Sequence, residues 1–124
     1  MTQEHKRILL VDDDEDVLES TQLALEQHGY SVLIARDGSE ALVRAERDLP
    51  DLIILDVVMP RRSGFSVLER LRAGHNRSPR IMVVTGNREP RHKEFAESHG
   101  ADAFMHKPYD IDELIDRVET LLLM

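Results

Sequence analysis

Short apolar runs alternate along this chain with longer stretches in which apolar residues recur every three or four positions. An apolar run of this length favours a strand buried on both faces, whereas the three-to-four spacing favours an amphipathic helix. We therefore predict five strands, each followed by a helix. The predicted strands cover residues 8–11, 32–35, 52–55, 81–84 and 103–105.

The predicted helices have recognisable starts and apolar faces. Asp37 with Glu40, and Asp110 with Glu113, fit the capping-box pattern with Asp in place of Ser or Thr. Ser63 can cap the third helix. The face of the last helix is the cleanest, and that of the helix over residues 90–99 is the sparsest. In chain order the five faces contain Val17, Thr21, Ala24, Leu25 and His28; Ala41, Leu42, Ala45 and Leu49; Phe65, Leu68 and Leu71; Phe95 and Ala96; and Ile111, Leu114, Ile115, Val118, Leu121 and Leu122.

Strands and helices that alternate in this way build a parallel sheet with helices on both faces. The 124 residues fit one domain of common size. Ligands of such sheets bind beyond the carboxyl ends of the strands, near the point where the strand order reverses. The residues that directly follow each strand are therefore the candidates for chemistry.

Acidic residues follow the first and third strands. Asp12 and Asp13 follow the first strand, and Asp56 follows the third, shortly before Pro60 stops that strand. Crowded carboxylates repel one another and favour a hard cation such as Mg²⁺, with Mn²⁺ as the alternative. The acids after the first strand could instead serve only the helix that follows them. We expect both roles, with Asp14 as the cap and the two preceding acids facing the site.

A cation and a hydroxyl follow two further strands. Lys107 follows the fifth strand, and Thr85 follows the fourth with Gly86 leaving room beside it. Taken singly, Lys107 reads as a solvated lysine and Thr85 as a β-branched strand residue. Beside a carboxylate cluster, however, a cation and a hydroxyl donor are what a transferring phosphoryl group needs. The strand ends together therefore indicate phosphoryl transfer.

The amino-acid composition disfavours several classes of binding partner and location. The net charge of −8 disfavours nonspecific nucleic-acid binding, and the absence of Trp disfavours a base-stacking platform. No apolar run is long enough to cross a bilayer, and the first seven residues are polar, unlike a signal peptide. The absence of Cys excludes disulfides and permits a reducing cytoplasm, which is the location we expect.

The motifs together resemble the receiver domain of the two-component response regulators, over nearly the whole chain. They lie at residues 8–13, 56–60, 63–64, 83–86 and 107–108. The resemblance implies an α/β fold of the CheY-like, flavodoxin-like class. This fold is a doubly wound (βα)5 domain with a five-stranded parallel sheet in the order 2-1-3-4-5. We expect residues 1–124 to form a single receiver domain without an effector domain, either as a stand-alone receiver or as a piece of a longer regulator or hybrid kinase.

The resemblance implies a role for each site residue. Asp56 is expected to accept a phosphoryl group from the phosphohistidine of a sensor histidine kinase or a histidine phosphotransfer protein. Asp13 and Asp56 are expected to bind Mg²⁺ through their carboxylates, and Val58 through its backbone carbonyl. Asp12 is expected to act largely through water. Lys107 is expected to pair with Asp56 at rest and with the phosphoryl group afterwards.

The resemblance also implies a conformational switch. Thr85 is expected to swing toward the phosphoryl oxygens, and the aromatic Phe104 to turn inward as it moves. The Lys107–Pro108 peptide is expected to be cis. The surface of the fourth helix, fifth strand and fifth helix would then meet a downstream protein, an effector domain or a second copy of the chain. The sparse apolar face of the fourth helix fits an element of low local stability. Such a chain catalyses only the phosphorylation and dephosphorylation of its own Asp56.

Some positions depart from the family pattern. The family often carries a polar residue two places after the nucleophile, where this chain has Val58. An apolar side chain cannot orient an attacking water, so we predict a long-lived phosphoaspartate. Asn87 flanks the same route for water. Arg61 and Arg62 lie at the mouth of the site, where they form a solvated loop or steer an acidic partner.

Three alternative functions fit the residues less well. A haloacid-dehalogenase-like phosphatase would use the spacing of Asp12 and Asp14, but it would leave Asp56 without a role and needs a cap domain. A nucleotide-binding flavodoxin-like module would have Gly, Ser or Thr after the first strand, because three Asp there repel phosphate. A receiver that acts as a scaffold without phosphorylation has no support, since every expected acid, hydroxyl and cation is present.

Overall fold

Five strands alternate with five helices in the part of the chain that the structure describes, as predicted. The computed structural model describes residues 5–59, 64–73, 79–86 and 90–124. The strands are β1 (Arg7–Val11), β2 (Ser31–Ala35), β3 (Leu52–Asp56), β4 (Arg80–Thr85) and β5 (Ala103–His106). The helices are α1 (Glu15–Gln27), α2 (Gly38–Asp48), α3 (Gly64–Arg72), α4 (Pro90–Ser98) and α5 (Ile111–Leu122).

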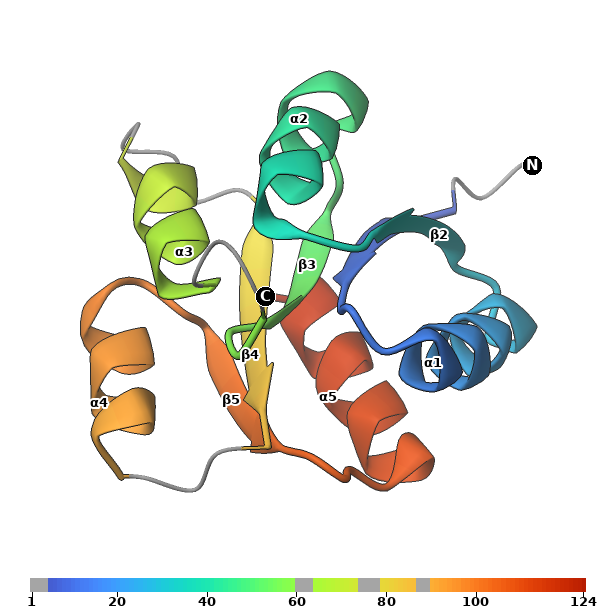
Figure 1. Ribbon diagram of the computed structural model, residues 1–124. Coiled ribbons are helices and arrows are strands. Elements are labelled where there is room, and N and C mark those ends of the chain that lie inside the picture. Colours follow the sequence, from blue (N-terminus) through green and yellow to red (C-terminus); the bar gives the residue numbers. More distant parts are fainter. Residues whose placement is uncertain (1–4, 60–63, 74–78, 87–89) are drawn as a thin grey trace.

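The strands form one parallel sheet in the order β2-β1-β3-β4-β5, which confirms the predicted order. Helices α1 and α5 cover one face of the sheet, and α2, α3 and α4 cover the other (Figure 1). Val11, at the end of β1, is in register with Leu55 near the end of β3. The residues that follow these two strands therefore emerge side by side at the carboxyl edge of the sheet.

Apart from polar residues at their ends, the central strands β1, β3 and β4 are apolar at every position, because both faces of the sheet are covered. In β3, Leu52 and Ile54 belong to the core beneath α1 and α5, whereas Ile53 and Leu55 belong to the core beneath α2, α3 and α4. All four side chains are fully buried. Such strands show no alternation of polar and apolar residues, which is the pattern of a doubly covered parallel sheet.

Aspartates cap three of the helices, as predicted. The Asp14 carboxylate accepts hydrogen bonds from the backbone amides of Asp16 and Val17 at the start of α1. Asp37 caps α2 and Asp110 caps α5 in the same way. Each cap satisfies amides that lack a partner within the helix. These helices therefore begin where the sequence predicted.

Two of the predicted apolar faces need correction. In α1 the buried side chains are Leu18, Thr21 and Leu25, whereas His28 is exposed. Leu49 was predicted to face the core but is 73% exposed. The physical reason is that α2 ends at Asp48, and Leu49 adopts the left-handed conformation with φ of 47°. The helix therefore ends one residue before Leu49, and helical spacing no longer determines the direction of this side chain.

Hydrogen bonds from Arg72 join three segments at the amino edge of the sheet, opposite the strand ends considered above. Its guanidinium donates to the carbonyl oxygens of Pro79 at 2.7 Å and Gly100 at 2.9 Å. It also donates to the Asp102 carboxylate at 2.7 Å. The end of α3, the start of β4 and the connection from α4 to β5 are thus held together at one point.

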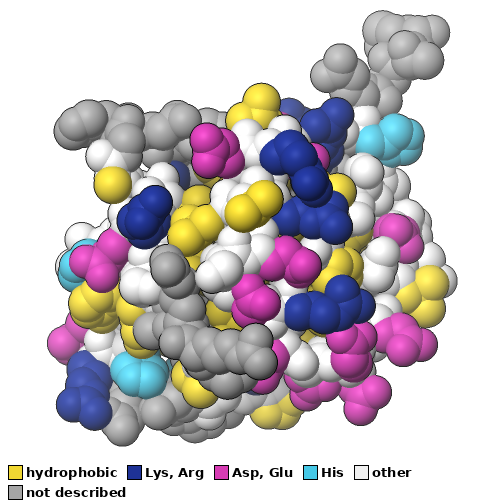
Figure 2. Space-filling view, turned by 45° about the horizontal axis from the view of Figure 1, so that its top comes forward, with side chains coloured by type: hydrophobic (Ala, Val, Ile, Leu, Met, Phe, Trp, Pro, Cys, Tyr) yellow, Lys and Arg dark blue, Asp and Glu magenta, His cyan; other side chains and the backbone are white. Residues whose placement is uncertain are grey.

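Charged side chains of both signs are interspersed over one face of the molecule (Figure 2). Acidic side chains lie among the basic ones there, so the charge on this face is not segregated by sign. No helix within the described residues has the length and apolar character needed to cross a membrane.

Candidate functional site

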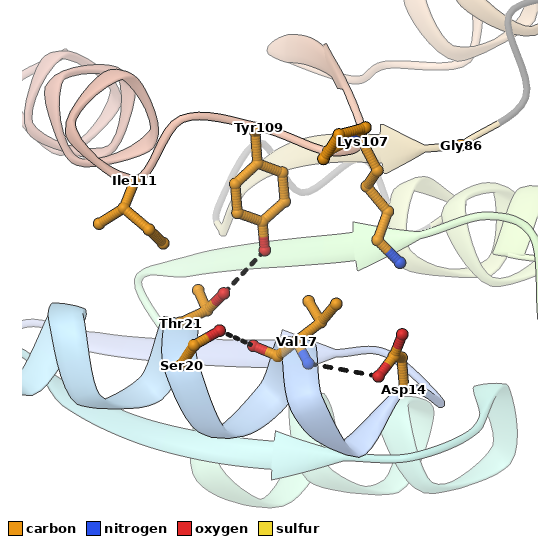
Figure 3. A pocket seen from close by; sticks show the side chains of 9 residues that line it. Asp14, Val17, Ser20, Thr21, Gly86, Lys107, Tyr109 and Ile111 are labelled. Carbon is orange, nitrogen blue, oxygen red and sulfur yellow. Dashed lines mark hydrogen bonds between the residues drawn. The ribbon is translucent and has the colours of Figure 1, made fainter.

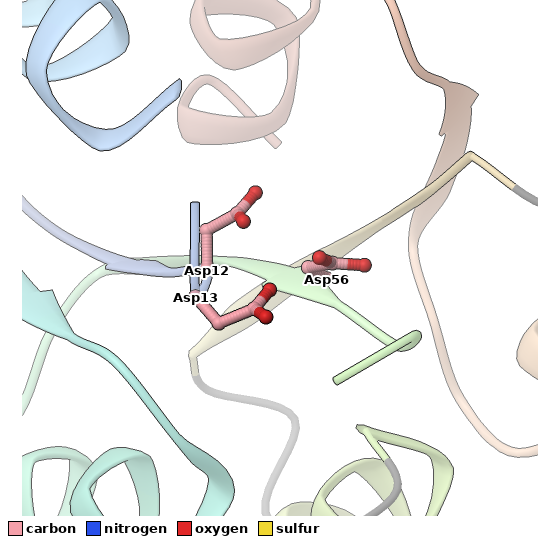
Figure 4. Close-up of side chains that lie close together, drawn as sticks. All are labelled: Asp12, Asp13 and Asp56. Carbon is pink, nitrogen blue, oxygen red and sulfur yellow. The ribbon is translucent and has the colours of Figure 1, made fainter. Parts of the chain in front are cut away.

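Three carboxylates meet at the carboxyl edge of the sheet, as predicted. Asp12 and Asp13 come from the loop after β1, and Asp56 is the last residue of β3 (Figure 4). One carboxylate oxygen from each residue lies within 4.8 Å of the others. Asp12 and Asp56 are buried, with 1% and 2% of their surface exposed, whereas Asp13 is exposed. The cluster therefore has two buried members and one that faces solvent.

Backbone amides hold one oxygen of each buried carboxylate. The amide of Val58 donates to Asp56 Oδ1 at 3.0 Å, and the amide of Asp14 donates to Asp12 Oδ1 at 2.9 Å. Both donors lie two residues beyond the carboxylate that they hold, which is the geometry of an Asx turn. The second oxygen of each carboxylate is left to face the site.

Lys107 reaches these second oxygens from the segment after β5. Its Nζ lies 2.7 Å from Asp12 Oδ2 and 3.1 Å from Asp56 Oδ2. Its backbone amide donates to the carbonyl of Thr85 at 2.9 Å, and the Lys107–Pro108 peptide is cis, as expected. Sequence reasoning anticipated the contact with Asp56 but missed the shorter contact with Asp12. The predicted strand order was the signal for both contacts, because it places the ends of β1, β3 and β5 at the same edge of the sheet.

The site holds more negative than positive charge. Burial, supported by the nearby Asp12 carboxylate, raises the pKa of Asp56 to about 6, against the opposing effects of the Val58 amide and Lys107. Burial disfavours the Lys107 ammonium, but its hydrogen bond to Asp12 and the charges of both acids leave its pKa raised. One ammonium thus serves two buried carboxylates beside the exposed Asp13. The oxygen donors and the excess negative charge fit a hard divalent cation.

Of the predicted switch residues, Thr85 lies at the same edge, and Phe104 lies two residues before the end of β5. Thr85 is fully buried at the end of β4. Phe104 is half-buried in β5, and its ring meets the His106 ring edge-on, with centroids 5.2 Å apart. A Cβ atom added at Gly86 would have no heavy atom within 4 Å, in line with the room expected beside Thr85. The movements of Thr85 and Phe104 stay predictions.

Gly64 lets the start of α3 approach the end of β3. A Cβ atom at this position would lie 2.3 Å from Val57 Cα and 2.6 Å from the Asp56 carbonyl oxygen. The Gly64 amide also donates to the Val57 carbonyl at 3.2 Å. Any other residue would therefore displace the backbone next to Asp56. The sequence singled out Gly64 only as part of a motif, and this close approach was not foreseen.

Several predicted residues lie outside the described part of the chain. They are Pro60, Arg61, Arg62, Ser63 and Asn87. The steering role of the two arginines, the cap at Ser63 and the contribution of Asn87 to the water route therefore stay predictions. Val58, on the same route, is described and is 49% exposed.

A cavity of about 520 Å³ lies beside Lys107, between α1 and the segment that joins β5 to α5. Tyr109 projects across it, and its hydroxyl lies 2.9 Å from the hydroxyl of Thr21 on α1 (Figure 3). Sequence reasoning placed Thr21 on the buried face of α1 but did not find its partner. A hydroxyl on an otherwise apolar helix face was the signal that a buried hydrogen bond would be needed.

The fold and this site match one protein family. Residues 8–119 match the family model described as "Response regulator receiver domain". The chain therefore belongs to that family and is a phosphoacceptor receiver domain of two-component signal transduction, as the sequence motifs predicted.

Individual relatives agree with this assignment. The chain is 42% identical to "Response regulator MprA" of Mycobacterium leprae, covering 94% of this chain and 50% of that protein. It is 41% identical to "Alkaline phosphatase synthesis transcriptional regulatory protein PhoP" of Bacillus subtilis, covering 95% of this chain and 49% of that protein. It superposes with a TM-score of 0.87 on a CheY-like receiver domain from Methanospirillum hungatei, with 34% identity and coverage of 96% and 94%. The chain spans about half the length of these curated relatives.

Proposed function

We propose that Asp56 is the phosphoacceptor of this receiver domain and that its donor is the phosphohistidine of a histidine kinase or phosphotransfer protein. The observation that carries the proposal is the position of this carboxylate. It is buried at the end of β3, one of its oxygens contacts Lys107 Nζ at 3.1 Å, and two further acids lie within 4.8 Å. An isolated strand-end Asp needs none of these neighbours.

In the proposed transfer, one Asp56 oxygen forms a bond to phosphorus while the bond from phosphorus to the partner's imidazole nitrogen breaks. The leaving nitrogen keeps the electron pair of that bond. Lys107 already contacts Asp56, so its ammonium can follow the transferred charge to a phosphoryl oxygen. Thr85 would donate its hydroxyl to another phosphoryl oxygen. Positioning and charge neutralisation of this kind are the main requirements of phosphoryl transfer.

Asp12, Asp13 and Asp56, together with the Val58 carbonyl, would hold a divalent cation. An all-oxygen donor set suits Mg²⁺, with Mn²⁺ as the alternative. When bound, the ion supplies positive charge against the phosphoryl oxygens. Burial, and to a lesser extent the Asp12 charge, raises the pKa of Asp56, and a buried carboxylate in such surroundings gains from a cation as well as from a proton.

The same residues would let the domain accept a phosphoryl group from a small acyl phosphate and lose it again to water. Both are reactions of the chain on its own Asp56, so we propose a signalling role without turnover of a separate substrate. We assign the exchange with the kinase to the cytoplasm, following the family.

We propose that phosphorylation acts through the surface of α4, β5 and α5. A cavity of about 300 Å³ on this surface is lined by Phe104, by Lys93 from α4 and by Glu113 and Arg117 from α5. Side chains of opposite charge line this cavity, which suits a two-fold symmetric contact between copies of the chain. An effector domain or a separate target protein would meet the same surface.

The test is the intact mass of the protein after incubation with Mg²⁺ and a small acyl phosphate. We expect one phosphoryl adduct in the wild type, none without Mg²⁺ and none in Asp56→Asn. Asp16→Asn is a matched control, since Asp16 is an exposed acid of the same run that lies outside the cluster, and it should keep the adduct.

Other outcomes would contradict the proposal. No adduct in the wild type would favour a scaffold that is not phosphorylated. An adduct that survives in Asp56→Asn would point to Asp12 or Asp13, and continuous release of phosphate would favour a phosphatase.

A further inference from the structure

A buried pair of hydroxyl groups connects α1 to the segment that follows Lys107. Thr21 is 1% exposed, in the middle of α1, between the buried Leu18 and Leu25. Its Oγ1 lies 2.9 Å from the hydroxyl oxygen of Tyr109, and either group can be the donor. The contact joins residues that are 88 positions apart in the chain.

Apolar side chains of the same shape could supply the burial that this pair provides to the core. Replacing both partners of a buried hydrogen bond by apolar groups of the same shape is often nearly neutral. Val at position 21 and Phe at position 109 would fill the same space beside Leu18 and Leu25. A hydrogen bond is directional, whereas apolar burial is not. We infer that this hydroxyl pair fixes the position of the segment that carries Tyr109.

Tyr109 packs against the core cluster but also borders open space. The ring lines the cavity of about 520 Å³ on the side of the site and also the cavity of about 300 Å³ on the surface of α4, β5 and α5. A side chain bordered by open space on two sides loses dispersion contacts on both. The hydrogen bond to Thr21 is therefore the directional contact that sets the orientation of this ring.

One end of the hydrogen bond lies close to Lys107 in the chain, and the other lies on α1, the helix that follows Asp12 and Asp13. Tyr109 is two residues from Lys107, and the two side chains project from the same segment toward α1 (Figure 3). Thr21 lies seven residues, or about two helical turns, after Asp14. The amide of Asp14 holds the Asp12 carboxylate at 2.9 Å, and that carboxylate receives Lys107 at 2.7 Å. The hydroxyl pair thus closes a ring of contacts that contains the ion pair between Lys107 and Asp12.

The Tyr109 hydroxyl also lies within electrostatic reach of the site. Burial is the main reason that the pKa of Tyr109 is raised, while the hydrogen bond from Thr21 opposes the rise. The charges of Asp12 and Asp56 raise it further, and that of Lys107 lowers it. This hydroxyl therefore experiences the same charges that phosphorylation changes.

We propose that Tyr109 is a positioning residue for phosphoryl transfer, which holds Lys107 over the acid cluster through its hydrogen bond to Thr21. The inference rests on the proposed role of Asp56. Lys107 must leave the two carboxylates and meet a phosphoryl oxygen, and the fixed segment behind it limits the volume that its ammonium searches. A well-positioned catalytic group gains rate through this restriction.

The experiment compares Thr21→Val, Thr21→Ser, Tyr109→Phe and the double variant Thr21→Val with Tyr109→Phe. The measured quantities are the maximal phosphorylation rate and the half-saturating concentration with a small acyl phosphate in Mg²⁺. We expect Thr21→Val and Tyr109→Phe each to lower the maximal rate by about two- to tenfold, the change that one hydrogen bond supports. The half-saturating concentration should be unchanged, and Thr21→Ser, which keeps the hydroxyl, should keep the wild-type rate.

The double variant and a control test whether the effect belongs to this one contact. The double variant should be no slower than the slower single variant, because both changes remove the same hydrogen bond. Tyr30→Phe is the matched control, since Tyr30 packs against the same core cluster as Tyr109. It should leave the rate unchanged.

Three results would overturn the inference: wild-type rates in both single variants, additive losses in the double variant, or an equal loss in Tyr30→Phe. Each leaves the adduct on Asp56 of the wild type intact, so each is distinguishable from failure of the proposed function.

Discussion

Helices α4 and α5 flank the same edge strand, but they are attached to the domain in different ways. Helix α5 buries Leu114, Ile115, Val118 and Leu121, and an Asp cap holds its start. In α4, all of which the structure describes, Ala96 alone is buried. Burial of apolar side chains is the main source of helix stability in a folded domain. The comparison indicates that α5 belongs to the stable frame and that α4 is the element most easily displaced.

Aromatic contacts take the place of aliphatic burial beneath α4. The Phe65 ring of α3 meets the rings of Phe95 and His92 edge-on, with centroids 4.7 and 5.1 Å apart. Phe95 in turn stacks on His99 at 3.8 Å. Each such contact is worth about 0.5–1.5 kcal/mol beyond the burial of its area. A few contacts of this size hold α4, so a charge change at the site can compete with them.

The strongest test of the stability assigned to α5 is a cavity-forming substitution in its buried face. We expect Leu114→Ala to lower the free energy of unfolding by about 2–5 kcal/mol, because Leu114 is fully buried and the cavity cannot fill from solvent. Urea unfolding measures the change. Leu23→Ala, at a position 57% exposed on α1, should change it by no more than about 0.5 kcal/mol. Equal effects of the two substitutions would contradict the assignment of α5 to the stable frame.

The negative charge of the unphosphorylated Asp56 carboxylate should destabilise the folded protein, and the pH dependence of unfolding should reveal this. Asp56 has a pKa raised from 3.8 to about 6 in the folded protein. Between these pH values the folded state holds a proton that the unfolded state has lost, so its stabilising contribution is lost as the pH rises through about 6. Relative to Asp56→Asn, the wild type should lose on the order of 2–3 kcal/mol between pH 4 and pH 7.

Urea unfolding of both proteins across this pH range, without divalent cations, measures the difference. A difference that stays constant with pH would contradict the raised pKa. Addition of Mg²⁺ at pH 7 should return part of the lost stability to the wild type and less to Asp56→Asn, which lacks one of the carboxylate ligands.

Phosphorylation should affect the two helices unequally. We expect amide exchange in α4 to change by about fivefold or more when Asp56 is phosphorylated, as for a coupling energy of about 1 kcal/mol, whereas exchange in α5 stays within error. Hydrogen exchange followed by mass spectrometry of the phosphorylated and unphosphorylated protein measures both helices at once. Exchange in α4 that does not respond would remove it from the switch.

The smallest expected effect concerns the lifetime of the phosphoryl group on Asp56, which sets how long the two helices differ. Val58 is 49% exposed and offers no polar atom from its side chain to a water that approaches Asp56. We expect Val58→Asn to hasten loss of the phosphoryl group by about two- to tenfold, the gain from one hydrogen bond to the attacking water. Decay of the intact-mass adduct gives the rate, and Val58→Ala serves as the apolar control. Equal decay in Val58→Asn and the wild type would show that another feature limits the reaction.

The sequence predicted the parts of the fold that depend on local pattern. Fully apolar runs gave the buried strands, and Asp14, Asp37 and Asp110 gave the helix starts, because a cap acts on amides only two or three residues away. The convergence of the acids followed as well, since the carboxyl ends of neighbouring parallel strands must meet at one edge.

Contacts between distant segments were not predictable in this way. The hydrogen bond between Thr21 and Tyr109 and the approach of Gly64 to Val57 depend on how helices settle on the sheet, which leaves no periodic trace in the chain. Leu49 was misplaced for a local reason, because helical spacing does not reveal the residue at which a helix ends.

The hydrogen bonds of Arg72 bear on how α4 can move. They hold the Gly100 carbonyl and the Asp102 carboxylate, just beyond the C-terminal end of the helix at Ser98. The opposite end, at Pro90, follows the strand end that carries Thr85. A helix that is held at its C-terminal end and displaced at its N-terminal end rotates about the held end. The displacement of α4 should therefore be greatest at Pro90, and a partner that contacts the first turn of the helix would sense the signal most strongly.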